Sequence, residues 1–313
     1  MTSTTQEKPT LVLGGTGKTG RRVVARLRAR GLPVRVGSRS GQPPFDWEDR
    51  STWAPALRGV GSVYLTYYPD LAVPGAVEAA GSFAELAVRS GVPRLALLSG
   101  RGEPEAERAE EAVRDTGAEL TILRSTWFMQ NFSEDYMLEH VLSGEIRLPA
   151  GHVPTPFLDA DDIVDVAVAA LTDDRHVGQL YELTGPRSLT MAQAAAEIAE
   201  AAGREVRYVP VSLEQHRGRG RRARRARRGD RPAHLPVQRG RRRAQRQHDG
   251  RRPAGPRPLG AGLRRLRTRY GRQRRLERIR GDRLRRETMD DALVALTLVT
   301  ALGCGLNAGG GGG

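Results

Sequence analysis

The stretch LVLGGTGKTGRRVV, residues 11–24, constrains the fold most, because it joins an apolar run to a helical run through a glycine-rich turn. Gly15, Gly17 and Gly20 fit the pattern Gly-x-Gly-x-x-Gly of the first strand–helix turn in dinucleotide-binding folds. In that pattern the first glycine permits the tight turn, the second lets the backbone approach the pyrophosphate, and the third lets the helix pack on the strand. Free N–H groups at the helix start favour the anion.

A nucleoside triphosphate loop is the competing interpretation, because Gly17-Lys18-Thr19 matches the end of its motif. That motif requires a glycine five residues before the second glycine, and Val12 stands there. The sequence therefore favours a dinucleotide.

Short apolar runs alternate with helical patterns up to residue 125. The expected strands are 10–14, 34–38, 62–68, 94–99 and 119–124, and the expected helices are 19–30, 74–90 and 104–116. Strands that are apolar throughout are typical of parallel sheets covered on both faces. The prediction is an α/β fold, an extended Rossmann fold with a doubly wound parallel sheet. Residues 40–60 are interpreted as a loop or a short strand.

The pattern changes after residue 125. Small strands are expected at 145–151, 178–185 and 205–212, and helices at 159–173 and 190–203 with Asp159 and Thr190 as N-caps. We therefore predict an NADP-binding Rossmann core at 1–124, a smaller substrate lobe at 125–215 interleaved with the core, and an arginine-rich tail at 216–313.

Charge is distributed unevenly along the chain, whose net charge is +15. Residues 217–286 hold 29 of the 51 basic residues, all arginines, and four acids, so this segment carries +25 and the remainder −10. With little apolar periodicity, the tail is expected to be disordered. One interpretation is a nucleic-acid arm, but base-stacking aromatics are missing except for Tyr270. The other, which we favour, is a GC-rich gene read out of frame from near His216.

The remaining composition points to the cytoplasm. Cys304 is the only cysteine, so no intrachain disulfide forms. The polar start MTSTTQEKPT lacks the apolar core of a signal peptide. The apolar run 292–306 has 15 residues, fewer than the roughly 20 that span a bilayer.

The second expected strand bears on which dinucleotide binds. NAD-binding folds place an acid about 20 residues after the glycines to accept from the ribose 2′-OH. No Asp or Glu occurs from Lys18 to Phe45, and the strand ends in Ser38 and Arg39. Arg39, with Ser38 and Lys18, suits a 2′-phosphate. NADP(H) is therefore favoured over NAD(H).

Several motifs in order, over about residues 9–215, resemble the NmrA-like branch of the atypical short-chain dehydrogenases/reductases. They are GGTGKTGRRV, VRVGSRS, FDWED, VYLTYYPD, LRSTWFMQNF and FLDADDIVDVAVAAL. The resemblance implies an extended Rossmann fold that binds NADP(H). It also implies either a reductase of quinones or azo dyes, or a cofactor-binding redox sensor for transcription factors.

The resemblance also implies roles for individual residues. The pyrophosphate would lie on Gly14, Gly15, Thr16, Gly17, Lys18 and Thr19. Arg39 would take the 2′-phosphate, Asp46 the adenine, and Thr66 and Tyr67 would lie along the cofactor. Phe128 to Asn131 would flank the nicotinamide. Ser99, at the end of the fourth strand, would face the site unless it is only a strand-end cap. Asp161 and Asp162 match an acidic pair of the family, which we interpret as helix N-terminal charges.

The Tyr-x-x-x-Lys dyad of typical short-chain dehydrogenases is missing, because the chain's two lysines, Lys8 and Lys18, do not follow a tyrosine at that spacing. The catalytic residues therefore stay unassigned, and no metal site is predicted. The leading hypothesis is an NADPH-dependent reductase of a quinone-like, azo or other small-molecule acceptor. The alternative is a non-catalytic NADP(H)-sensing regulator with a protein partner. Nucleic acid and membrane partners are not expected, and homo-oligomerisation stays open.

Overall fold

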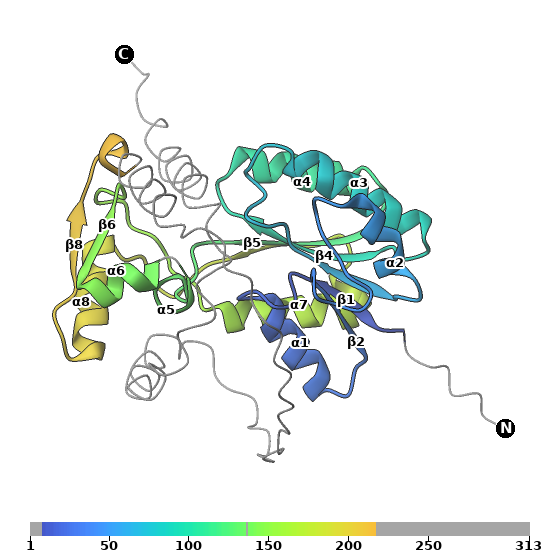
Figure 1. Cartoon of the computed structure of the whole chain (residues 1–313), viewed down its shortest axis with the longest axis horizontal. Helices are drawn as coiled ribbons and strands as arrows, with labels where there is room; N and C mark the ends of the chain where they lie inside the picture. Colours follow the sequence, from blue (N-terminus) through green and yellow to red (C-terminus); the bar gives the residue numbers. More distant parts are fainter. Residues whose placement is uncertain (1–7, 136, 217–313) are drawn as a thin grey trace, which may run out of the picture.

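A six-stranded parallel sheet forms the centre of the protein (Figure 1). The computed structural model describes residues 8–135 and 137–216. The sheet order is β2-β1-β3-β4-β5-β7. Its strands are β1 (Thr10–Leu13), β2 (Val34–Gly37), β3 (Ser62–Leu65), β4 (Arg94–Gly100), β5 (Glu119–Ser125) and β7 (Leu180–Leu183). This confirms the predicted parallel α/β fold. The predictions for the arginine-rich tail, the run 292–306 and Cys304 lie outside the described residues.

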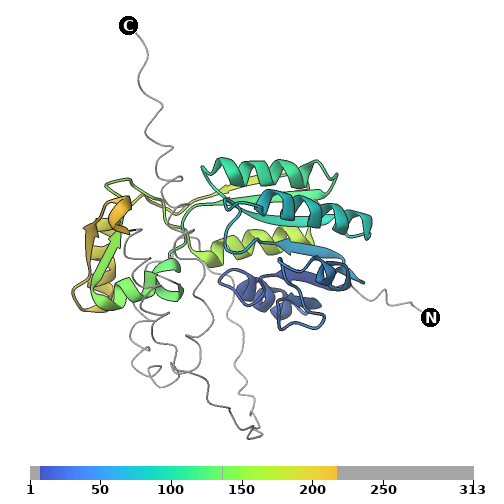
Figure 2. The same cartoon turned by 45° about the horizontal axis from the view of Figure 1, so that its top comes forward.

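Helices cover both faces of the sheet because successive strand residues point to opposite sides (Figures 1 and 2). Leu11 and Leu13 of β1 join the core under α2 (Trp53–Leu57), α3 (Ala76–Arg89) and α4 (Pro104–Arg114). Val12 points the other way, into the core under α1 (Gly20–Ala29) and α7 (Ala160–Thr172). Each strand thus buries both of its faces, which explains why strand and helix alternate along the chain.

A smaller lobe with its own core lies beyond the carboxyl end of β5 (Figure 1). It contains α5 (Asn131–Glu134), α6 (Met137–Ser143), β6 (Glu145–Leu148), α8 (Met191–Ala202) and β8 (Arg207–Pro210), with β6 and β8 paired in parallel. Two elements of the range 125–215 belong to the main body instead. β7 pairs with β5, and α7 packs on the sheet.

Both predicted N-caps are confirmed. The Asp159 side chain accepts a hydrogen bond from the Asp161 amide, and Thr190 forms a capping box with Gln193. Asp161 and Asp162 occupy the first turn of α7, where the helix dipole favours acidic side chains.

Residues 40–60 contain no strand in the structure. They form an irregular segment, a short 3₁₀ turn (Arg50–Thr52) and α2. Phe45, Trp47 and Trp53 cluster against Phe83 of α3, with ring centroids 5.5–5.7 Å from that ring, so aromatic packing fixes the segment. Within the described residues, no helix is both long and apolar enough to cross a membrane.

Candidate functional site

The glycine-rich turn lies at the point where the strand order reverses. β1 pairs with β2 on one side and with β3 on the other, and the turn 14–19 leaves the carboxyl end of β1 between them. Ligands of open α/β sheets bind in the crevice at such a switch point. The topology therefore places this turn at the expected binding edge.

Steric contacts or backbone conformation require glycine at several positions of the turn. The residue that makes the tight turn differs from the predicted one. Gly14, not Gly15, has the left-handed conformation of the tight turn, with φ of 56°. A Cβ on Gly15 would lie 2.9 Å from both the Val12 carbonyl oxygen and Val36 Cγ1. Gly15 therefore lets the turn lie close to β1 and β2. A Cβ on Gly20 would lie 2.2 Å from the Gly14 oxygen, so Gly20 lets α1 pack closely on the turn itself.

Backbone donors of this turn are available to a ligand. Gly17 N–H bonds to the Gly14 oxygen at 2.8 Å. The amides of Thr16, Lys18, Thr19 and Gly20 find no acceptor among the described residues, and Thr16 and Gly17 are exposed. A Cβ on Gly17 would meet only the Gly14 oxygen, at 3.2 Å, so its outer side is open. Open backbone with unpaired N–H groups at a helix start fits a pyrophosphate.

Lys18 points toward the segment after β5. Its Nζ donates to Asn131 Oδ1 at 2.5 Å, pairs with Asp135, and lies 5.8 Å from the centre of the Phe128 ring. β5 is separated from β2 by three strands spaced about 4.8 Å apart. The prediction that Lys18 helps Arg39 to hold a 2′-phosphate is therefore wrong, because its side chain is directed to the other end of the sheet edge.

Ion pairs fasten α1 to the segment after β5. Arg22 bonds Glu134 through two nitrogens at 2.8 and 2.9 Å and lies 3.2 Å from Asp161, and Arg21 also pairs with Glu134. Burial is the largest single influence on Arg22 and by itself lowers its pKa. The hydrogen bond to Glu134 and the charges of the neighbouring acids together outweigh burial, so the pKa of Arg22 is raised. The turn and the entrance to the lobe are thereby held together.

Ser38 and Arg39 follow β2 at the other end of the edge. Arg39 is exposed, and within residues 8–135 and 137–216 it has no ion-pair partner. Asp46 lies farther along the same loop, where its carboxylate accepts from the Glu48 amide at 3.1 Å. Arg39 thus has no competing carboxylate among the described residues, which suits a phosphate ligand.

Thr66 and Tyr67 follow β3, next to the turn. A Cβ on Gly14 would lie 3.1 Å from Thr66 Cγ2, so the two loops touch. Tyr67 packs on Trp47 with ring centroids 4.9 Å apart. Burial and the charge of Glu48 raise the pKa of Tyr67, which makes its phenol a weaker acid than usual.

Ser99 is not brought to this edge. It is 4% exposed, and its Oγ donates to Glu110 of α4 at 2.6 Å. Arg124 of β5 closes the same network through Nε and Nη2, which lie 2.7–3.0 Å from the Glu110 carboxylate. The predicted cofactor-facing role of Ser99 is therefore corrected to a buried structural hydrogen bond.

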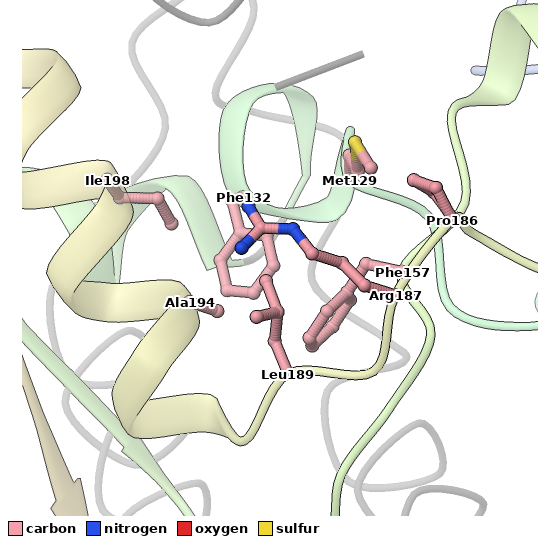
Figure 3. Close-up of a pocket in the computed structure, with 8 residues that line it drawn as sticks. All are labelled: Met129, Phe132, Phe157, Pro186, Arg187, Leu189, Ala194 and Ile198. Atoms are coloured by element: carbon pink, nitrogen blue, oxygen red, sulfur yellow. The ribbon is translucent and has the colours of Figure 1, made fainter. Parts of the chain in front are cut away.

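An apolar pocket opens in the lobe, close to the segment that contains Phe128 and Asn131 (Figure 3). The Arg187 guanidinium extends across it and pairs with Glu197 at 2.7 Å. The lining residues are Met129, Phe132, Phe157, Pro186, Arg187, Leu189, Ala194 and Ile198. Sequence reasoning missed this pocket, because its walls come from four separate segments.

Together these features define a Rossmann-type dinucleotide-binding protein, with a glycine turn at the switch point and a second lobe beyond the sheet edge. Residues 107–218 match the NmrA-like family. The chain is 35% identical to the uncharacterized oxidoreductase YesF of Bacillus subtilis over 222 residues, 67% of this chain and 77% of that protein. It therefore belongs to the NmrA-like family.

A further relative and two solved structures are similar to this chain. The NAD(P)H azoreductase of Xenophilus azovorans is 32% identical over 66% of this chain and 78% of its own length. The fold resembles that of the Escherichia coli NADPH-dependent quinone oxidoreductase QOR2 bound to NADPH, with a TM-score of 0.57 and 22% identity over 68% of this chain and 82% of that chain. It also resembles Citrobacter sp. triphenylmethane reductase bound to NADP(H), with a TM-score of 0.55 and 20% identity over 69% and 83%.

Proposed function

We propose that the protein is an NADPH-dependent reductase of a small aromatic acceptor, such as a quinone or an azo compound. The observation that carries this proposal is the glycine turn at the switch point, whose four amides lack acceptors among the described residues. The oxidoreductases among its relatives and the NADPH-bound structures of the same fold support it.

In this proposal, the turn 14–19 holds the pyrophosphate, and Ser38 and Arg39 hold the 2′-phosphate. Asp46 lies toward the adenine, Thr66 and Tyr67 lie along the cofactor, and Phe128 and Asn131 flank the nicotinamide. NADPH supplies a hydride when bound. The chain orients it, and the apolar side chains around Met129 and Phe132 offer a surface on which an aromatic acceptor can pack.

Calorimetric titration of the full chain with NADPH and NADH tests the proposed cofactor. NADPH is expected to bind more tightly, because Arg39 is an exposed cation directly after β2 and no Asp or Glu occurs from Lys18 to Phe45. Arg39→Ala should weaken NADPH binding by about 10- to 100-fold, as expected for the loss of a charge-assisted bond worth roughly 1.5–3 kcal/mol. NADH binding should change little.

Arg28→Ala is the matched control, since Arg28 is an exposed arginine near the end of α1. Equal affinity for both cofactors, or NADPH binding that Arg39→Ala leaves unchanged, would contradict the assignment of Arg39. Tight binding without turnover over a panel of quinones and azo compounds would favour the non-catalytic sensor instead.

A further inference from the structure

The carboxyl group of Glu103 lies on the carboxyl end of β4. Glu103 follows the turn at Gly102, whose φ is 77°, and precedes α4. A Cβ on Gly100 would lie 2.1 Å from Glu103 Oε2 and 2.6 Å from Cδ, so the carboxyl occupies the space of the missing side chain. The chain thus folds back to seat an acid on the last residue of a central strand.

This acid is buried without a hydrogen-bond partner. Glu103 is 8% exposed, and its Oε2 has no partner in the described part of the chain. It precedes α4 but does not cap it, because its side chain accepts no amide hydrogen there. Buried polar groups are nearly always hydrogen-bonded, so an unpaired one in a native fold calls for an explanation.

The charged groups that act on Glu103 are both acidic. They are Asp70, in the loop between β3 and α3, and Glu105 of α4. Burial and these negative charges raise the pKa of Glu103 to about 8. Burial also raises the pKa of Asp70. Burial and the neighbouring acids therefore favour the protonated form of Glu103.

The position of Gly100 in β4 shows which face this carboxyl occupies. Leu97 packs under α3 and α4, and Ser99 bonds to α4, whereas Ala96 and Leu98 point to the opposite face. By this alternation position 100 faces the same side as Ala96 and Leu98, where Phe128 also packs. Gly100 pairs with Ser125, the last residue of β5 before that segment. The acid thus lies near Asp70 of the loop after β3, on the face of the sheet where Phe128 also packs.

We propose that Glu103 is the proton donor of the reductase, in place of the missing tyrosine–lysine dyad. This inference rests on the proposed function. A quinone or azo acceptor gains two electrons and one hydrogen as hydride from NADPH, which becomes NADP⁺, and the acceptor becomes an anion. The Glu103 carboxylic acid transfers its proton to the anionic oxygen or nitrogen, and the carboxylate then regains a proton from water. Tyr67 serves this purpose less well, because its phenol is a weakened acid.

Two acceptors with different proton requirements test the proposal. A neutral quinone needs a hydride and a proton, whereas a triarylmethane dye cation becomes neutral with the hydride alone. Glu103→Gln should lower kcat for the quinone by about 100-fold or more, the usual size of a general-acid contribution, and change dye reduction less than about twofold. Glu111→Gln, which removes an exposed acid of the same helix, should affect neither reaction.

Infrared spectroscopy provides a second measurement that needs no turnover. The full chain at neutral pH should show a carbonyl band of a protonated carboxylic acid that Glu103→Gln removes and Glu111→Gln retains. Equal loss of quinone and dye reduction in Glu103→Gln, unchanged quinone reduction, or no difference in the carbonyl band would overturn the role of Glu103 while leaving the reductase proposal intact. If the unaltered protein binds NADPH but reduces neither acceptor, the proposed function fails and this inference fails with it.

Discussion

Replacing Gly20 with alanine is expected to abolish dinucleotide binding and to lower the free energy of unfolding by about 3 kcal/mol, the upper part of the range for overpacking. The new Cβ would lie 2.2 Å from the Gly14 oxygen, 2.7 Å from the Gly14 carbonyl carbon and 2.9 Å from Gly15 Cα. All three are backbone atoms, so no side-chain rotation relieves the overlap. The first turn of α1 must move away, and its amides move with it. Urea unfolding and calorimetric titration with NADPH measure the two effects.

Gly17→Ala is the matched comparison, because its Cβ would contact only the Gly14 oxygen, at 3.2 Å. This variant should keep its stability within about 1 kcal/mol, since a small shift relieves one such contact. It should still lose affinity, because the methyl group stands on the open side of the turn. Normal NADPH binding by Gly17→Ala would show that the pyrophosphate lies elsewhere, and a stable, binding-competent Gly20→Ala would show that α1 tolerates displacement.

The parts of the site that follow from the sequence are those fixed by near neighbours in the chain. The turn at Gly14–Thr19 joins β1 directly to α1. Gly20 contacts Gly14, only six positions earlier, so the spacing of the glycines is enough to predict that these residues lie close together. The alternation of apolar strands and helices likewise determines the parallel sheet, because each connection is local. The fold class and the position of the glycine turn at the first strand–helix connection could therefore be predicted without coordinates, whereas the strand order was not predicted.

Side-chain directions depend on contacts between distant residues, and the sequence does not encode those in any local pattern. Lys18 points to Asn131, 113 positions away, because Asn131 and Glu134 of α5 contact Lys18 and Arg22 at the start of α1. Ser99 turns inward because Glu110 and Arg124 meet beneath it. Glu103 reads as an ordinary helix-start acid until the turn at Gly102 seats its carboxyl on Gly100. No spacing of residues in a motif predicts these three contacts.

The free energy of unfolding is expected to fall as the pH rises from about 5 to about 8, because of Glu103. In the unfolded chain this carboxyl has its ordinary pKa of 4.5, and in the folded protein burial and Asp70 raise the pKa to about 8. Between these values the folded state binds more protons than the unfolded state, so stability declines with pH. The decline should total on the order of 3 kcal/mol, allowing for relaxation of the Asp70–Glu103 pair, since one pKa unit corresponds to about 1.4 kcal/mol.

Glu103→Gln removes the titrating group and should flatten this decline, whereas Glu111→Gln should retain it. Groups whose pKa is lowered by arginine partners, such as Glu145 and Glu182, act mainly below pH 5, outside this window. Urea unfolding of the three proteins at half-unit pH intervals separates the contributions. If the unaltered chain and Glu103→Gln lose stability in parallel between pH 5 and 8, Glu103 is ionised in the folded protein at neutral pH. The hypothesis of a protonated carboxyl at the end of β4 is then wrong.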